Sequence, residues 1–177
     1  ENKLEAEQAA LAYEYILEKE RREAERRIIE AEAKALATLN HPNIVTVHEF
    51  GQRGDFYFLL MEFVDGPNLR HLLLDHRLSP QEALAIVPPL CDALEFAHKH
   101  GVLHRDIKPG NMMLDHEGNL WITDFGLAKI TEQEDLTQSR ALVGTLRYMA
   151  PEQVRGQHGD VGPSSDVYGI GAILYRL

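Results

Sequence analysis

The residues best suited to chemistry lie in one short segment and at one position downstream of it. Residues His104–Asn111 read His-Arg-Asp-Ile-Lys-Pro-Gly-Asn, and Asp124 follows 18 residues after Asp106. Phosphoryl transfer needs a carboxylate that orients the attacking hydroxyl and accepts its proton, a role that suits Asp106. It also needs oxygen ligands for Mg²⁺, which Asn111 and Asp124 can supply. Lys108 adds positive charge where the transferred group becomes more negative.

These residues form part of a larger set of motifs. Together with Asp124-Phe125-Gly126 and the later Ala150-Pro151-Glu152, the segment around Asp106 resembles the eukaryotic-like Ser/Thr protein kinases, most closely their bacterial members. The resemblance runs from about Glu32 to the end of the chain. It implies an α+β fold of the protein kinase type, with a partial small lobe (helix C plus a few antiparallel strands) and a truncated, mainly helical large lobe. We therefore expect a kinase domain that is incomplete at both ends.

The resemblance also implies a role for each residue of the motif. Asp106 is expected to be the catalytic base, Lys108 to contact the transferred phosphate, and Asn111 and Asp124 to hold the metal. Thr145 would bridge Asp106 and Lys108 and shape the loop that receives the peptide. The implied cofactors are ATP and Mg²⁺, and the implied partners are proteins phosphorylated on Ser or Thr.

A second group of positions matches the family's nucleotide pocket. Residues 61–64, Met-Glu-Phe-Val, resemble the gatekeeper and hinge, in which the backbone of Glu62 and Val64 would bind adenine. Met113 would lie under the purine. Glu32 stands where the family has its helix-C glutamate.

The resemblance extends to positions that regulate the family. Four of them fall where kinases stack a regulatory hydrophobic spine: Leu36, Val47, His104 and Phe125. Asp166 matches the acid that holds the catalytic loop from the next helix. Thr137 and Ser139 are candidate phosphorylation sites, whose phosphate Arg105 could pair.

The sequence departs from the family where kinases grip the nucleotide. The first glycine is Gly51, which follows Glu32, so no Gly-rich loop precedes helix C, and the strand lysine that pairs with the helix-C glutamate is missing. Retention of Asp106, Lys108, Asn111 and Asp124 together favours a phosphoryl-transferring kinase. The alternatives are a pseudokinase-like regulatory or binding module and a coiled-coil interaction protein.

The elements that must position these residues begin with a long charged segment. Residues 1–40 contain no Gly or Pro and are rich in Ala, Glu, Lys and Arg, which predicts one long helix or two in sequence. Glu18 precedes Arg22 by four residues, in the order that stabilises a helix. The middle of the segment lacks large apolar side chains for about three turns, which interrupts a coiled-coil seam. We predict an exposed helix over residues 1–37 that runs into helix C, with self-association through it as the alternative.

Pro42 ends this helix and the pattern changes. We divide the chain into the helical segment, residues 1–37, and a partial kinase domain, residues 32–177, with its small-lobe part and hinge at 32–64 and its large-lobe part at 65–177. After Pro42 we expect a hairpin, with strands at Ile44–Phe50 and Phe56–Val64 around a turn at 51–55. A helix should follow from Pro80 to Gly101, capped by Ser79 and with a kink or late start at Pro88-Pro89. The remaining expected elements are short strands at Val102-Leu103, Met112–Leu114 and Leu120–Thr123 and a buried helix from Val167.

Composition sets outer limits on function. The 177 residues are 44% hydrophobic, enough to bury a core, and the net charge is −10. Residues 1–37 carry 7 basic and 10 acidic residues (−3), and residues 38–177 carry 11 basic and 18 acidic residues (−7). Both parts are acidic, which argues against nucleic acid or an anionic membrane as the main partner.

The cysteine, the histidines and the apolar runs add further limits. Cys91 is the single cysteine, so no intrachain disulfide forms, and its apolar neighbours lead us to expect it in the core. The nine histidines, for example His98 and His100, lack Cys or carboxylate partners at ligand spacing, which favours solvent-facing or capping roles. No apolar run is long enough to cross a bilayer. We therefore expect a soluble, cytoplasmic chain.

Overall fold

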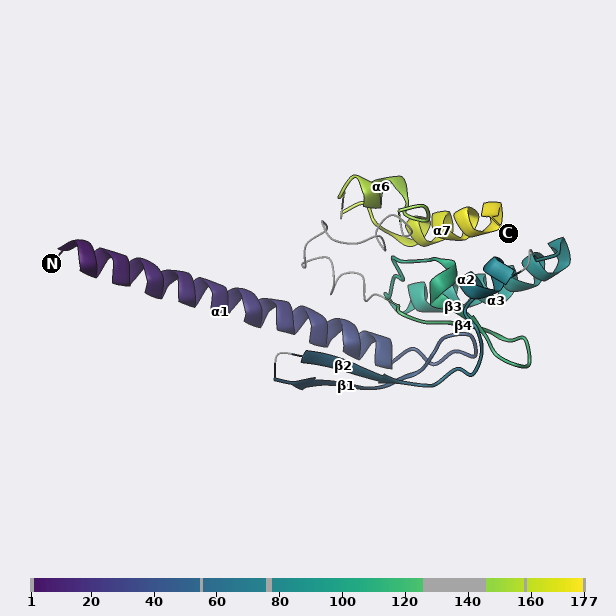
Figure 1. Ribbon diagram of the computed structural model, residues 1–177, viewed down its shortest axis with the longest axis horizontal. Coiled ribbons are helices and arrows are strands. Elements are labelled where there is room, and N and C mark those ends of the chain that lie inside the picture. The colour runs from purple at the N-terminus through teal and green to yellow at the C-terminus, as the bar shows by residue number, and fades with distance from the viewer. Residues whose placement is uncertain (1, 55, 76–77, 126–145, 158, 177) are drawn as a thin grey trace. The chain divides into compact units, whose positions relative to one another are not determined.

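The computed structural model describes residues 2–54, 56–75, 78–125, 146–157 and 159–176. By its contacts the chain forms two compact units, Glu1–Lys34 and Ala35–Leu177. Helix α1, Asn2–Ala37, supplies the first unit and continues into the second (Figure 1). None of the described helices is both long and apolar enough to cross a bilayer.

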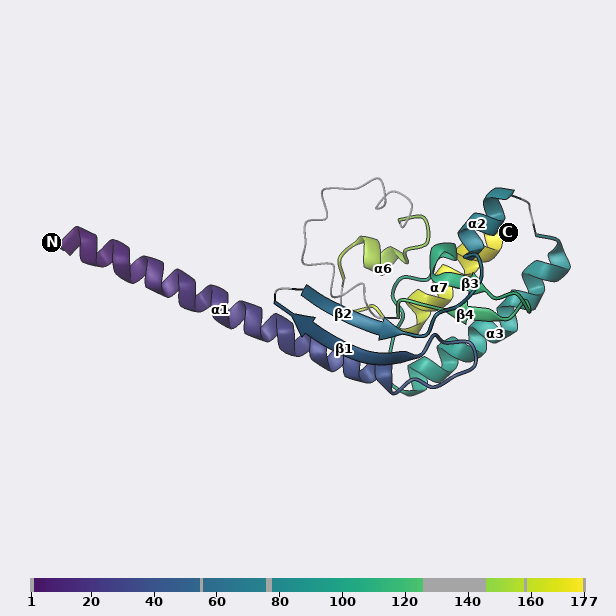
Figure 2. The same cartoon turned by 60° about the horizontal axis from the view of Figure 1, so that its bottom comes forward.

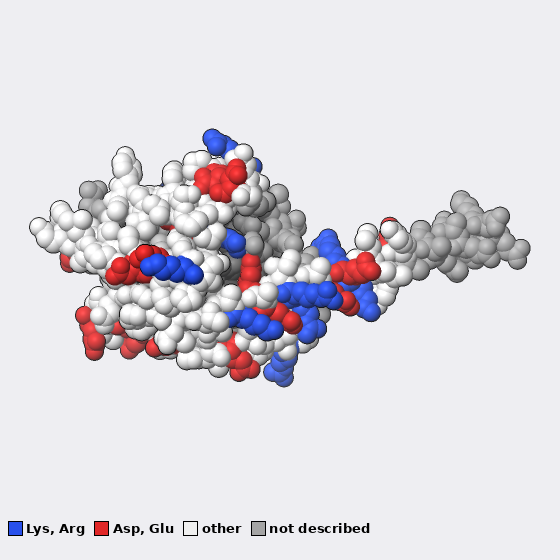
Figure 3. Space-filling model, turned by 180° about the vertical axis from the view of Figure 1, so that it is seen from behind, with Lys and Arg blue, Asp and Glu red and all other residues white. Residues whose placement is uncertain are grey.

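Helix α1 confirms the prediction of a long helix, because it runs for 36 residues without interruption. Glu18 accepts a 2.8 Å hydrogen bond from Arg22, and Glu30 accepts one of the same length from Arg26. Acidic and basic side chains are interspersed along the coloured part of this helix (Figure 3). Exposed pairs of this kind add a few tenths of a kcal/mol each. Helix α1 therefore presents charge of both signs.

The second unit begins with a hairpin of β1, Val47–Arg53, and β2, Phe56–Met61. The strands are antiparallel, and Arg53 pairs with Phe56. The expected turn at residues 51–55 was therefore too long, since residues 51–53 still belong to β1. Gly54 takes a positive φ of 63°, which suits the tight turn that remains.

A short backbone ladder joins the segment before β1 to the larger part of this unit, residues 65–177. The N–H of Val45 donates to the carbonyl of Ile122 at 2.9 Å, and the N–H of Ile122 donates to the carbonyl of Asn43 at 2.8 Å. The side chain of Asn43 also donates to the carbonyl of Leu120 at 2.8 Å. The turn that Pro42 starts is thus anchored on the strand that leads to Asp124.

The larger part is mainly helical and holds one short hairpin (Figure 2). Its elements are α2 (Leu69–Asp75), α3 (Pro80–Lys99), the 3₁₀ turn η1 (Pro109–Asn111), β3 (Met112–Leu114), β4 (Leu120–Ile122), α6 (Pro151–Val154) and α7 (Pro163–Arg176). Ser79 caps α3 as predicted, because its hydroxyl accepts from the N–H of Glu82 while the Glu82 carboxylate accepts from the N–H of Ser79. Gly101, with a φ of 75°, follows the end of α3.

Pro88-Pro89 does not delay the start of α3, because buried Ile86 and Leu90 on either side hold the helix against the core. The other possibility, a kink at these prolines, stays a prediction. Two other expectations about these elements were wrong. Val102-Leu103 is irregular rather than a strand. Helix α7 begins at Pro163, four residues before the predicted start, because Pro is well accommodated in a first helical turn.

Helix α3 lies at the centre of the core, where it packs against β4 and α7. The most deeply buried large side chains are Leu39, Leu69, Leu90, Met112, Ile122, Ile173, His104 and Asp166. Cys91 is exposed, contrary to expectation. Its neighbour Leu90 points into the core, and one residue along a helix turns the side chain by about 100°.

Candidate active site

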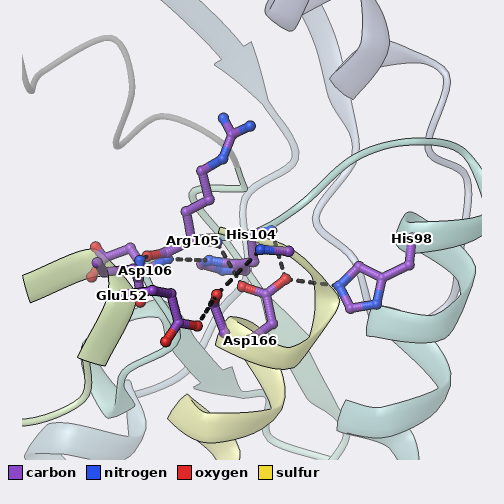
Figure 4. A network of polar contacts seen from close by, with 9 residues as sticks. His98, His104, Arg105, Asp106, Glu152 and Asp166 are labelled. Carbon is purple, nitrogen blue, oxygen red and sulfur yellow. Dashed lines mark hydrogen bonds and ion pairs between the residues drawn. The ribbon is translucent and has the colours of Figure 1, made fainter. Parts of the chain in front are cut away.

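The centre of the candidate site is an irregular loop between α3 and η1, and Asp166 on α7 holds its backbone. Oδ2 of Asp166 accepts from the N–H of His104 at 2.9 Å, and Oδ1 accepts from the N–H of Arg105 at 2.8 Å. Figure 4 shows the Asp166 carboxylate facing these two residues. Asp166 is 1% exposed, so these charge-assisted bonds form away from water.

His98 completes the environment of Asp166. Its Nε2 donates to Oδ2 of Asp166 at 2.7 Å, from α3 on the opposite side of the carboxylate (Figure 4). The side chain of His98 is 16% exposed, so the prediction of a solvent-facing or capping residue was wrong. The partners are 68 residues apart, and no local spacing indicates the pair.

His104 is buried and held as one tautomer. Its Nδ1 accepts from the N–H of Asp106 at 3.2 Å, which leaves Nε2 to donate to the carbonyl of Thr123 at 2.9 Å. Desolvation by burial lowers the pKa of His104, and the nearby carboxylates of Asp166 and Asp106 oppose this shift. A neutral ring fits both hydrogen bonds, because a protonated Nδ1 could not accept one.

Three of the predicted residues meet at the end of this loop and in η1. Nζ of Lys108 lies 2.5 Å from Oδ2 of Asp106. Nδ2 of Asn111 donates to the same oxygen at 3.1 Å and to the carbonyl of Asp106 at 2.9 Å. Both charged side chains are partly open to solvent, 21% exposed for Asp106 and 27% for Lys108. A carboxylate in this position is oriented yet accessible, as a general base must be.

Asp124 lies beside this group because of the β3–β4 hairpin. The N–H of Thr123 donates to the carbonyl of Asn111 at 3.0 Å, so the next residue, Asp124, follows close to Asn111. Asp124 is exposed and has a positive φ of 60°, which Asp tolerates better than most residues. This backbone bond therefore brings two residues with oxygen-bearing side chains, Asp124 and Asn111, close together along the backbone.

This pair fits Mg²⁺, which proteins often hold through one or two side chains together with phosphate oxygens and water. Since Nδ2 of Asn111 donates to Asp106, Oδ1 is the atom of Asn111 that suits a cation. Among the described residues, no group of three or more His, Cys, Asp or Glu side chains could hold a metal ion by itself.

The residues expected to contact adenine follow β2. The N–H of Glu62 donates to the carbonyl of Thr46 at 2.9 Å, so its own carbonyl is the group suited to bind a base. Val64 is buried at 7% exposure. Met113 lies in β3 and forms a bridge to Asn68, which brings it beside the segment after Val64.

Two glycines allow close approaches that position this site. A Cβ at Gly66 would lie 1.9 Å from the carbonyl oxygen of Leu114, so only glycine lets the segment after the hinge pass β3. A Cβ at Gly169 would lie 2.7 Å from Cβ of Ile107, so glycine lets α7 approach the catalytic loop. No local sequence pattern indicates either role, because both depend on contacts between distant segments.

The four residues expected in a hydrophobic spine lie in one region. The rings of His104 and Phe125 are 4.5 Å apart between centroids, and Phe125 is buried at 4% exposure. Leu36, Val47 and Phe125 line one small pocket, whose other walls are Leu39, Ile44, Val45, Leu59, Met61, Ile122 and Asp124. Asp124 therefore borders an apolar pocket next to the polar group around Asp106.

Helix α6 and the residues before it are joined to α7 by side-chain hydrogen bonds. Oε1 of Glu152 accepts a 2.5 Å hydrogen bond from Oγ of Ser165, which is the main reason that its pKa is lowered. The hydroxyl of Tyr148 accepts from Nη1 of Arg176 at 2.6 Å. Both bonds join residues 146–152 to α7.

Several expected site residues cannot be placed around this centre. Thr145, Thr137 and Ser139 lie outside the described residues. Glu32 belongs to α1 in the first unit, Glu1–Lys34. The roles expected for these four residues stay predictions.

Comparisons with known proteins agree with this geometry. The kinase domain of PknI from Mycobacterium tuberculosis superposes with a TM-score of 0.67 at 32% identity, over 85% of this chain and 55% of that one. The serine/threonine-protein kinase PrkC of Bacillus subtilis is 38% identical over 147 residues, 82% of this chain and 22% of that protein. The serine/threonine-protein kinase PknB of Mycobacterium leprae is 41% identical over 152 residues, 82% of this chain and 24% of that protein.

These similarities confirm the expected fold class, a partial α+β kinase fold. The chain spans about a quarter of the length of these two curated relatives and about half of the solved kinase domain. The sequence model of the protein kinase domain matches residues 3–177. With nearly its whole length matched and with Ser/Thr kinases among its relatives, this chain belongs to the protein kinase family.

Proposed function

We propose that this chain contributes to an ATP-dependent protein Ser/Thr kinase, which transfers the γ-phosphoryl group of ATP to Ser or Thr hydroxyls of proteins. The observation that carries the proposal is the contact of the Asp106 carboxylate with Lys108 at 2.5 Å and with Asn111 at 3.1 Å. A binding module would have no chemical need for these three side chains and Asp124 together.

In this mechanism each residue acts through the atoms described above. Asp106 accepts the proton of the substrate hydroxyl and orients its oxygen for attack. Lys108 stabilises negative charge on the phosphoryl group. Asn111 Oδ1 and the Asp124 carboxylate would hold Mg²⁺, which would supply positive charge to neutralise the phosphates when bound. The backbone of Glu62 and Val64 binds adenine, and Met113 lies beneath it.

The experiment is phosphate transfer from labelled Mg-ATP to degenerate peptide libraries centred on Ser, Thr or Tyr. We expect a kinase that contains this chain to label the Ser and Thr libraries, and Asp106→Asn to abolish the labelling. Asp160→Asn is the matched control, because Asp160 is exposed and the chemical change is the same. Labelling that survives in Asp106→Asn would refute the assignment of the base.

The same protein preparation tests the pseudokinase-like alternative. That alternative arises because residues 1–50 contain neither the Gly-rich loop nor the strand lysine with which other kinases grip the phosphates. A binding module that does not use nucleotide should show no Mg-dependent stabilisation by ATP in a thermal-shift titration. Saturable stabilisation together with labelled peptide would exclude it.

The domain division at residues 32–177, the cytoplasmic location and self-association through residues 1–37 stay predictions.

A further inference from the structure

The peptide group that joins Arg105 to Asp106 is held on both sides by side chains. Its carbonyl, which belongs to Arg105, accepts a 2.6 Å hydrogen bond from Nε2 of Gln153. Its N–H, which belongs to Asp106, donates to Nδ1 of His104. Gln153 lies in α6, 48 residues along the chain from Arg105. The first bond therefore ties the backbone at Asp106 to a separate helix.

The backbone at this point needs such support. Arg105 has a positive φ of 67°, a conformation that is unfavourable for a residue with a side chain and persists only where its surroundings hold it. Asp166 holds the N–H of Arg105, and Gln153 holds its carbonyl. The peptide groups on both sides of Arg105 are thereby fixed, and the second one includes the backbone nitrogen of Asp106.

Gln153 also caps its own helix. Its Oε1 accepts from the N–H of Ala150 at 2.9 Å, which fixes the orientation of the amide with Nε2 toward Arg105. A helix cap at this position needs only an acceptor, and Glu serves as well as Gln. The donor half of the amide is required by the catalytic loop and not by α6.

We propose that Gln153 is a positioning residue for phosphoryl transfer, which holds the Arg105 carbonyl and so fixes the direction of the Asp106 carboxylate. This inference rests on the proposed function, since Asp106 is the base in that proposal. It also couples the position of α6 to that of the catalytic loop, because a shift of α6 would move the peptide group next to Asp106.

Three variants separate positioning from capping. Gln153→Glu keeps the acceptor for Ala150 and places a carboxylate oxygen against the Arg105 carbonyl. Gln153→Met has similar length but neither donor nor acceptor. Gln157→Glu is the matched control, because Gln157 is exposed just beyond α6 and gains the same charge.

The first measurement is steady-state peptide phosphorylation by the full chain. We expect both Gln153 variants to lower kcat roughly ten- to a hundredfold with the peptide KM unchanged, because the base is misdirected while peptide binding is kept. Gln157→Glu should behave like the wild type. An unchanged kcat, a loss confined to KM, or an equal loss in Gln157→Glu would overturn the proposal.

The second measurement does not depend on activity. NMR of the labelled chain reads the carbonyl carbon of Arg105 and the amide nitrogen of Asp106, which belong to the peptide group that Gln153 binds. We expect both resonances to move in the two Gln153 variants and to stay in Gln157→Glu, while the amide of Val154 keeps its exchange protection in Gln153→Glu. Unmoved resonances would overturn the positioning role even in an active chain. An inactive wild type with moved resonances would instead count against the proposed function alone.

Discussion

Replacing Asp166 with Asn should destabilise the second unit strongly, although the two side chains have the same size. The carboxylate uses two oxygens for three hydrogen bonds, with Oδ2 accepting from His98 and His104 and Oδ1 accepting from Arg105. Asn has one oxygen. Its best orientation keeps that oxygen toward His98 and His104, so that its NH₂ group meets the N–H of Arg105.

The cost follows from this geometry. A buried N–H without an acceptor costs about 1–3 kcal/mol, and each of the two remaining bonds loses about 1 kcal/mol when its acceptor becomes neutral. The sum is a loss of about 3–5 kcal/mol in the free energy of unfolding, a large part of the typical stability of a domain, about 5–15 kcal/mol. With a urea m value of about 2 kcal/mol/M, the midpoint should fall by about 1.5–2.5 M.

The assay is urea unfolding followed by the fluorescence of Trp121, the single tryptophan, which lies in β4 of the second unit. Its signal therefore reports on that unit and not on the first. Asp160→Asn makes the same chemical change at an exposed site and should stay within about 0.5 kcal/mol of the wild type. A loss of less than about 1 kcal/mol in Asp166→Asn, or equal midpoints in the two variants, would refute this account of the carboxylate.

Two further predictions concern titrating groups. Burial lowers the pKa of His104 below its unfolded value of about 6.5, so its contribution to stability is complete above that pH and is lost as the pH falls further. The urea midpoint of the wild type should therefore fall from pH 7 to pH 5 more steeply than that of His104→Gln, and parallel curves would contradict this. The pKa of Asp115 is lowered to about 2, mainly by the hydrogen bond from Trp121 and then by that from Asn119. Trp121→Phe should raise this pKa in a ¹³C carboxyl titration, and a value that stays near 2 would show that the indole is not the cause.

Much of the candidate site could be predicted from the sequence because its parts are close along the chain. Asp106, Lys108 and Asn111 lie within six residues, so their side chains are near one another along the chain and the hydrogen bonds among them are local. The long helix and the Ser79 cap were also predictable, since both depend on neighbours within one helical turn.

Other features depend on contacts that no local pattern contains. Pairing of His98 with Asp166 requires α3 and α7 to pack together, across 68 residues of sequence. Exposure of Cys91 depends on which face of α3 meets the core. The hydrogen bond of Gln153 to Arg105 requires α6 to lie against the catalytic loop.

The sequence by itself determined the family, the chemical types at the site and the order of its main elements. Only the tertiary structure decided how the catalytic loop is held: by Asp166 from one helix, by Gln153 from another, and by a glycine that lets α7 approach Ile107. The physical reason is that residue type and short spacing set local hydrogen bonds and turns, whereas support for a strained loop comes from groups that meet only when distant segments pack.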